Sequence, residues 1–190
     1  MNNKRDGIRH SGEGKSLILE NVWVRQSGQH AVFSTDSVPI IINSVLSESD
    51  LALEGRAGLM MENPTGGRPY LQNVTCAHNK TRGIWRAGGA LPEIYNAIVY
   101  HNGGEALRGF TADQAAYYSI IEDCNSVNEN LAVDPGFAYF DPNNVRISYN
   151  SPARNSGHPS LSYVNQVDMG GRERVLETRV DRGAYEIDCE

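Results

Sequence analysis

The segments PYLQNVTCAHNK (residues 69–80) and PEIYNAIVYHNG (residues 92–103) decide the fold, because they are two versions of one pattern. Three further segments align with them: LILENVWVRQSG (17–28), PIIINSVLSESD (39–50) and AAYYSIIEDCNS (115–126). The aligned position is an asparagine or a serine, and successive copies are 22, 30, 23 and 23 residues apart: Asn21, Asn43, Asn73, Asn96 and Ser119. Self-similarity at a period of about 20 to 50 residues is the signature of a repeat architecture.

Apolar residues alternate with period two around the aligned position, which predicts a strand with one buried face. A small residue followed by an aliphatic one predicts a second strand upstream of each copy: Gly7-Ile8, Ala31-Val32, Gly58-Leu59, Gly83-Ile84 and Ala106-Leu107. A repeat of 22 or 23 residues is too short for a βαβ unit of about 30 residues or a propeller blade of about 40. We therefore predict an all-β fold, a parallel β-helix of about five to six coils over residues 1–140. Residues 141–190 are predicted to form an irregular tail in the same domain that packs against or caps the coils.

Coils of a β-helix pair with their neighbours at about 4.8 Å, so equivalent side chains stack in columns. We expect the aligned asparagines to form such a column, with each amide donating a hydrogen bond to the next. Two residues further along, the alignment predicts an outward stripe that is mostly apolar: Trp23, Val45, Thr75, Ile98 and Ile121. An exposed stripe of this kind needs a cover, which we expect the tail to supply, with a partner subunit as the alternative.

Composition and charge argue against several classes of protein. The 190-residue chain has a net charge of −6 and a pI of about 5.4, which disfavours nucleic acid as a partner because such surfaces are usually basic. The three cysteines, Cys76, Cys124 and Cys189, are too few and too widely spaced for a disulfide framework or a zinc site. No apolar run suits a signal peptide or a membrane span. We expect no metal, no cofactor and no membrane partner.

The C-terminal part carries motifs in a fixed order: Asp134-Pro135-Gly136-Phe137, Ser151-Pro152-Ala153, Gly157, Asp168-Met169-Gly170-Gly171-Arg172 and Asp181-Arg182-Gly183-Ala184-Tyr185-Glu186. Together with the coil pattern of residues 7–130, this run resembles the C-terminal part of the right-handed parallel β-helix repeat proteins in the pectin-lyase-like superfamily. The resemblance implies a right-handed coil and a structural role for the tail motifs. It implies no single activity, because that superfamily includes lyases, hydrolases and adhesins. It also suggests a secreted or cell-surface location, although the chain shows no signal peptide, so the compartment stays open.

Stacking also predicts which polar side chains share a column. Five residues after the aligned position stand Gln26, Glu48, His78, His101 and Cys124. His78 and His101 should lie on neighbouring coils about 5 Å apart, with Glu48 one coil further away. A histidine beside a carboxylate can act as an acid/base pair or bind a metal, so these three are candidate catalytic residues. The alternative is a polar column at a turn, open to solvent. The insertion between residues 50 and 70 is the candidate wall of a groove.

A second candidate site is basic. Its ligand-binding residues would be Arg82, Trp85, Arg86, Tyr100 and Arg108. Arginine can bind a carboxylate in a bidentate manner, and the aromatic rings could stack on sugars. The alternative is ordinary solvated charge near the Thr81-Arg82-Gly83 turn.

These patterns favour a module that is not catalytic and that binds carbohydrate or another surface, or assembles with itself. The alternative is a polysaccharide lyase or glycoside hydrolase acting on acidic polysaccharide. Because coil structure begins by residue 7, little is left to cover the first coil. Proteins rarely leave such an edge bare, so we expect a homo-oligomer or an upstream domain over it.

Overall fold

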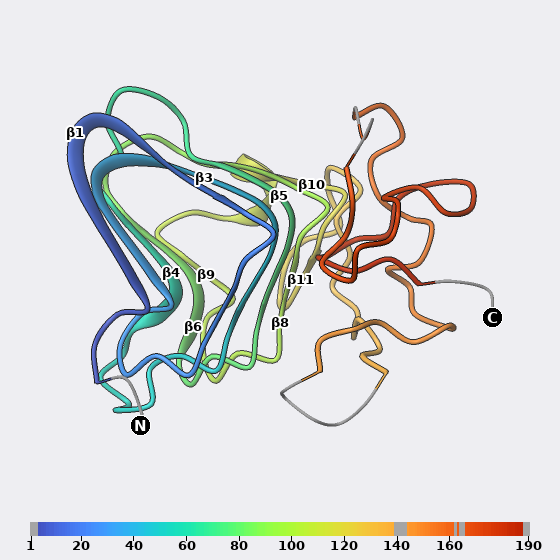
Figure 1. Ribbon diagram of the computed structural model, residues 1–190, viewed down its shortest axis with the longest axis horizontal. Helices are drawn as coiled ribbons and strands as arrows, with labels where there is room; N and C mark the ends of the chain where they lie inside the picture. Colours follow the sequence, from blue (N-terminus) through green and yellow to red (C-terminus); the bar gives the residue numbers. More distant parts are fainter. Residues whose placement is uncertain (1–3, 139–143, 162, 164–165, 188–190) are drawn as a thin grey trace.

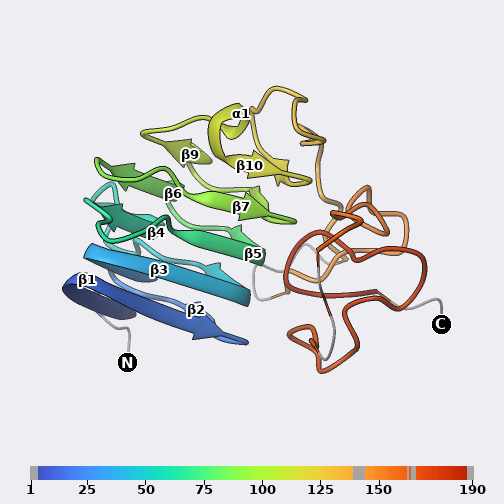
Figure 2. The same cartoon turned by 90° about the horizontal axis from the view of Figure 1, so that it is seen from above.

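Each coil of the chain lies in parallel on the one before it, and together they form an all-β solenoid of about five turns (Figures 1 and 2). The computed structural model describes residues 4–138, 144–161, 163 and 166–187. The strands are β1 (Ile8–Glu20), β2 (Trp23–Arg25), β3 (Val32–Ser47), β4 (Ala57–Glu62), β5 (Tyr70–Ala77), β6 (Arg82–Ala87), β7 (Glu93–Tyr95), β8 (Ile98–Tyr100), β9 (Leu107–Arg108), β10 (Ala116–Tyr117) and β11 (Ile120–Ile121). One short helix, α1 (Ala112–Ala115), lies in the last coil. Every pairing between these strands is parallel, which confirms the predicted parallel β-helix.

Equivalent strand segments build three faces of the stack (Figure 1). The first face comprises residues 8–11, 32–35, 57–62, 82–87 and 107–108. The second face comprises residues 15–20, 37–42, 70–72, 93–95 and 116–117. The third face comprises residues 23–25, 45–47, 75–77, 98–100 and 120–121.

The core consists of aliphatic columns that run along the stack. On the first face, the five predicted pairs are in register, so that these residues lie on one another: Ile8, Val32, Leu59, Ile84 and Leu107. The third face adds a second column of Val24, Leu46, Cys76, Val99 and Ile121. Burying one such side chain contributes about 1.5–3 kcal/mol. Because no coil can bury its own column, the stacking of neighbours supplies the stability.

The bend between the second and third faces explains the aligned asparagines. Asn43, Asn73 and Asn96 have φ of 46°, 53° and 52°, in the left-handed region that asparagine tolerates better than most residues. Asn73 Nδ2 donates to Asn43 Oδ1 at 3.0 Å, and Asn96 Nδ2 donates to Asn73 Oδ1 at 3.0 Å. The predicted amide column is therefore confirmed over these three coils, where all three side chains are buried.

The predicted alignment of the last coil is wrong by one residue. Tyr117 pairs with Tyr95, and Ile120 pairs with Ile98, so Tyr118 rather than Ser119 lies opposite Asn96. Tyr118 also has the left-handed φ of 50°.

The hydrophobic pattern accounts for the shift. The predicted alignment would have placed Glu122 in the inward position of Val99, and burying a lone carboxylate is costly. The observed pairing puts Ile121 there instead. As a consequence, Ile120 and not Ile121 holds the outward position, and Asp123 rather than Cys124 follows His101 in the polar column.

The tail covers the outward stripe of the third face and lies beside β8 and β11 (Figure 1). Val45 packs with tail residues that include Val145, Ala184 and Tyr185. Ile98 and Ile120 pack with Ile147 and Ala153. Hydrogen bonds fix the contact: Ala184 N donates to Thr75 Oγ1 at 3.0 Å, and Gly183 N donates to Asn96 O at 2.6 Å. The predicted boundary at residues 140 and 141 lies outside the described residues, as does Cys189.

The acidic residues of the tail motifs bind the backbone of the tail itself. Asp168 accepts hydrogen bonds from the amides of Gly170, Arg172 and Glu186. The Glu186 carboxylate accepts from the Asp181 amide and lies 2.9 Å from the buried Arg174 guanidinium. Burial raises the pKa of Glu186 to about 9, while Arg174 acts in the opposite direction. These contacts agree with the structural role that the motifs imply.

Candidate functional site

His78 and His101 lie where the register predicts, in the left-handed bend that follows the third face. Both have φ of 56°, and their rings are stacked with centroids 5.6 Å apart and an interplanar angle of 10°. Burial lowers the pKa of His78, and the neighbouring His101 lowers it further, while Glu48 opposes the shift. The arrangement therefore favours the neutral form of His78. A neutral His78 carries no positive charge that would repel His101.

Residues of the segment between β11 and the tail contact this histidine pair. The Phe137 ring contacts His78 at 5.6 Å and His101 at 6.0 Å between centroids. Asp134 Oδ2 lies 3.2 Å from His101 Nε2, and the two side chains are 61% and 40% exposed. The sequence motif that contains Asp134 and Phe137 indicated only a structural role, and nothing in its spacing pointed to the histidines. This segment therefore brings an aromatic ring and a carboxylate to the histidine pair.

Glu48 belongs to the same column but has a different partner. It has φ of 53°, and its Oε2 accepts a hydrogen bond from Gln26 Nε2 at 2.9 Å. Within the residues that the structure describes, no group of three or more His, Cys, Asp or Glu side chains is arranged to hold a metal ion. His101 is the member of the pair whose ring lies within 3.2 Å of a carboxylate, that of Asp134.

Three of the predicted ligand-binding residues gather on the outer side of the first face. The guanidinium carbons of Arg82 and Arg108 lie 4.9 Å and 5.2 Å from the centre of the Trp85 ring. Glu105 Oε2 accepts from Arg82 Nε at 3.2 Å and from Arg108 Nη1 at 2.7 Å. These hydrogen bonds hold the pKa of Glu105 below its usual value. We call Arg82, Trp85, Glu105 and Arg108 the arginine–tryptophan cluster.

The other two predicted residues lie elsewhere. Arg86 donates to the carbonyls of Gly89 and Gly109, at 2.7 Å and 2.8 Å, which anchors two turns. Tyr100 belongs to the third face, and its ring meets His101 edge-on with centroids 4.9 Å apart.

The insertion borders the arginine–tryptophan cluster. Asp50 is fully buried and accepts hydrogen bonds from the amides of Glu54, Gly55 and Arg56 at 2.8, 3.1 and 2.9 Å. Thr81 Oγ1 also donates to Asp50 Oδ2, at 2.7 Å. The loop so held lies next to Arg82, which donates from Nη1 to the Gly55 carbonyl. Residues 50–56, part of the insertion that we expected to form the wall of a groove, therefore lie beside the arginine–tryptophan cluster.

Two columns of outward-facing side chains were not predicted from the sequence. On the first face, Arg9 lies over Phe33 at 4.1 Å, and the same outward position continues through Met60, Trp85 and Arg108. Each of these residues lies two positions after the small residue of its coil. This regular spacing is the sequence signal from which the column could have been predicted.

On the second face, Tyr95 stacks on Tyr117 with centroids 5.2 Å apart and lies 5.9 Å from Tyr70. His158 of the tail meets Tyr95 edge-on, with ring centroids 5.8 Å apart. The stacked rings cover one another, so they present mostly edges to solvent.

Comparison with known proteins identifies one family. A family model described as the right-handed β-helix region matches residues 1–167. The searches of curated proteins and of solved structures found no match. Among the described residues, no helix has the length and apolar character needed to cross a bilayer.

Proposed function

The chain belongs to the right-handed β-helix family, and on that premise we propose that it is a non-catalytic module that binds acidic carbohydrate on its first face. The observation that carries the proposal is the arginine–tryptophan cluster, in which two guanidinium groups share a single carboxylate. One positive charge is left over, and each guanidinium has more donors than Glu105 uses. Planar donors of this kind suit the carboxylate of a uronic acid.

Trp85 supports the proposal by holding the two arginines in place. A cation above an aromatic ring gains about 0.5–1 kcal/mol at an exposed site. Both guanidinium groups pack against the ring. The ring therefore serves mainly to hold the two arginines in fixed positions, and it offers a ligand little contact area. Fixed donors lose less side-chain entropy when a ligand binds.

The separation of the candidate groups favours binding over catalysis. A lyase or hydrolase needs an acid or base within reach of the same sugar that its cations hold. Here the histidine pair lies against Phe137, whereas the arginines flank Trp85 on the first face. Glu48 is hydrogen-bonded to Gln26.

Calorimetric titration with a polyuronide and with a neutral glucan tests the proposal. We expect the polyuronide alone to bind, and Arg108→Ala to weaken binding about tenfold, the effect of losing about 1.4 kcal/mol. Glu105→Gln should tighten binding, because it removes the negative charge that neutralises part of the two arginines and repels a uronate. Arg25→Ala is the matched control, since Arg25 lies over Trp23 at 5.3 Å on another face; it should leave affinity unchanged.

The outcomes separate the alternatives. Equal binding by the Arg108→Ala and Arg25→Ala variants, or no binding at all, would show that the cluster is not the site. Ultraviolet absorbance by unsaturated products, lost in His101→Ala, would instead establish the lyase alternative.

A further inference from the structure

The first coil leaves one end of the stack open. β1 pairs with β3 along one edge, and the side chains of β1 are exposed or half-buried along its whole length. Ile18 is 65% exposed, while Leu17 and Leu19 are half-buried although they pack on the core. The aliphatic columns that begin with Ile8 and Val24 therefore start at a solvent-exposed end of the stack.

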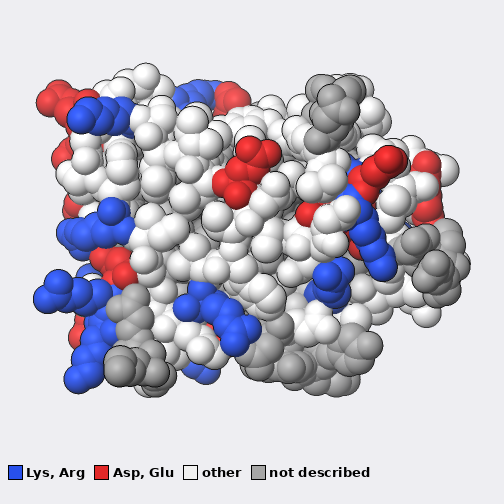
Figure 3. Space-filling model, in the orientation of Figure 1, with Lys and Arg blue, Asp and Glu red and all other residues white. Residues whose placement is uncertain are grey.

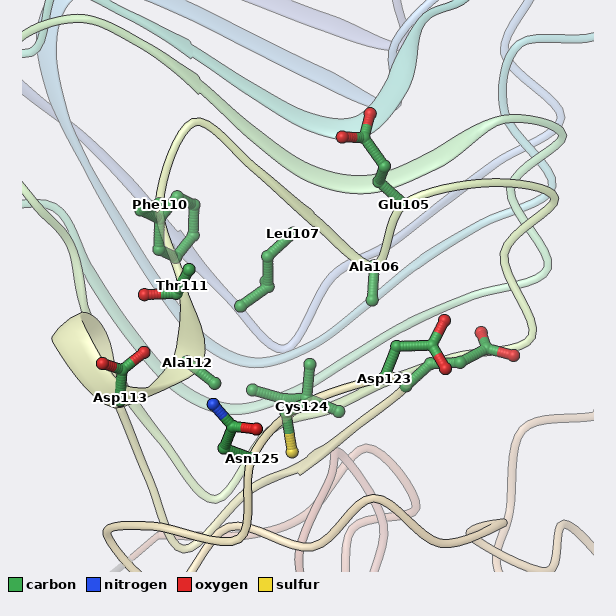
Figure 4. Close-up of a pocket in the computed structure, with 12 residues that line it drawn as sticks. Glu105, Ala106, Leu107, Phe110, Thr111, Ala112, Asp113, Asp123, Cys124 and Asn125 are labelled. Carbon is green, nitrogen blue, oxygen red and sulfur yellow. The ribbon is translucent and has the colours of Figure 1, made fainter.

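The opposite end of the stack holds a cavity of about 220 Å³ (Figure 4). Its apolar lining includes Leu107 and Ile121, with Phe110 and Cys124 beside them. Leu107 and Ile121 are the last members of the columns that start at Ile8 and Val24. The cavity is therefore part of the interior of the stack. Beside it, Leu131 forms a parallel bridge with Ile120 and its carbonyl accepts a hydrogen bond from the Ile121 amide. Residues 128–131 thus already cover the third face at this end, and the uncovered part lies over Leu107 of the first face.

The two ends carry opposite charge. Residues 4–25 contain five Lys or Arg and three Asp or Glu, whereas residues 105–134 contain one Arg and six Asp or Glu. Carboxylates line the cavity, from Glu105, Asp113, Glu122 and Asp123. In the view where the first coil is nearest the reader, most of the Lys and Arg of the stack lie along the left margin together with several Asp and Glu, and one acidic and one basic group lie nearer the middle (Figure 3).

From these observations we propose that the chain associates with itself head to tail, with the first coil of one copy docked over the last coil of a second copy. The apolar column of the first face would continue across the junction, Ile8 toward Leu107. The first coil, with its excess of Lys and Arg, would face the acidic residues around the cavity. The two surfaces are different, so the contact is heterologous and can repeat into a linear assembly.

A second copy fits these ends better than an unrelated partner does. The first face has the same strand register at both ends of the stack, because its strands belong to the same repeat. Opposite charges that meet across an interface favour the correct pairing and suppress the contact of like ends.

Sedimentation velocity of the whole chain at increasing concentration provides the test. We expect species larger than the 20.9 kDa chain, and less association as salt screens the charges. Two charge-reversed variants address the two ends separately: Lys15→Glu/Arg25→Glu at the first coil, and Asp113→Lys/Glu122→Lys at the cavity. Each variant alone should associate at least tenfold more weakly than the unmodified chain.

An equimolar mixture of the two variants gives the decisive result. Every head-to-tail junction in the mixture is again between opposite charges, so association should return. If the Asp113→Lys/Glu122→Lys variant alone assembled like the unmodified chain, the first coils would be meeting each other and the proposal would be wrong. A chain that stays monomeric at all concentrations would also overturn it.

Discussion

His30 is a residue at which burial makes the stability of the fold sensitive to pH. Its side chain is 3% exposed, and its Nδ1 accepts a hydrogen bond from the Ala57 amide at 3.0 Å. An acceptor at Nδ1 requires that this nitrogen carry no proton. Burial lowers the pKa of His30 from its usual 6.5 to about 4.

The resulting prediction concerns stability below neutral pH. The unfolded chain takes up a proton at His30 near pH 6.5 and the folded chain near pH 4, so the unfolded state binds more protons between these values. The stabilisation is present above about pH 6.5 and is lost as the pH falls toward 4, by about 3 kcal/mol in total. His30→Asn keeps an acceptor near Ala57 but does not titrate.

Urea unfolding of both proteins between about pH 4 and 7 measures the effect. The free energy of unfolding should fall more steeply with acid in the unmodified chain than in His30→Asn. Parallel curves would mean that other groups set the acid sensitivity.

Among the structural elements, the bend between the second and third faces depends on its asparagines in two separable ways. The left-handed φ of 53° requires a permissive residue at Asn73, and the buried amide contacts Asn43 and Asn96. Glycine satisfies the backbone as well as asparagine does, but it has no amide.

Asn73→Gly therefore isolates the contribution of the amide column. We expect a loss of about 1–3 kcal/mol in the free energy of unfolding, because buried partners lose their hydrogen bonds. Asn21→Gly is the matched control, since Asn21 occupies the same bend with φ of 52° but is exposed. Thermal or urea unfolding should show a small change for the control. A similar loss in both variants would assign the effect to the backbone.

The repeating elements could be predicted from the sequence because the stacking repeats there too. The five small–aliphatic pairs and the contact of His78 with His101 follow from one alignment. The alignment failed in the last coil because serine resembles asparagine chemically, whereas the hydrophobic register places Tyr118 in that position. Ser119 instead accepts a hydrogen bond from the Ala97 amide through its Oγ.

Only those residues of the candidate site that recur from coil to coil, such as His78 and His101, could be predicted from the sequence. Asp134 and Phe137 reach the histidines from a segment of irregular structure, which has no period to read. Glu105 bridges Arg82 and Arg108 from a neighbouring turn, and this contact depends on side-chain geometry rather than on spacing.

For the whole molecule, the docking of the tail should depend on Gly183. This residue has φ of +94°, and an added Cβ would lie 2.7 Å from Ile98 Cδ1 and 2.8 Å from Thr75 Oγ1. Gly183→Ala should weaken the docking by about 1–3 kcal/mol through overpacking. Gly171→Ala is the matched control, with a φ of +80° and no atom within 4 Å of the added Cβ.

Trp23 reports on the docking because it packs with the cluster of Val45, Ala184 and Tyr185. In a Trp85→Phe background, Gly183→Ala should shift Trp23 emission to longer wavelength and speed proteolysis of the tail. The Gly171→Ala protein should behave like its parent. Unchanged emission and proteolysis in Gly183→Ala would show that the tail tolerates the added methyl group.

The reach of the tail also restricts how a gene for this protein can lengthen. The tail meets Val45, Thr75, Ile98 and Ile120, one residue from each of four successive coils, and Trp23 of the first coil packs against the same cluster as Val45. Duplicating one 22- or 23-residue unit among these coils would displace these partners relative to one another by about 4.8 Å. A duplication ahead of the first coil leaves all five in place. Extra units can therefore be added on the outer side of the first coil, while the segment under the tail keeps a fixed length.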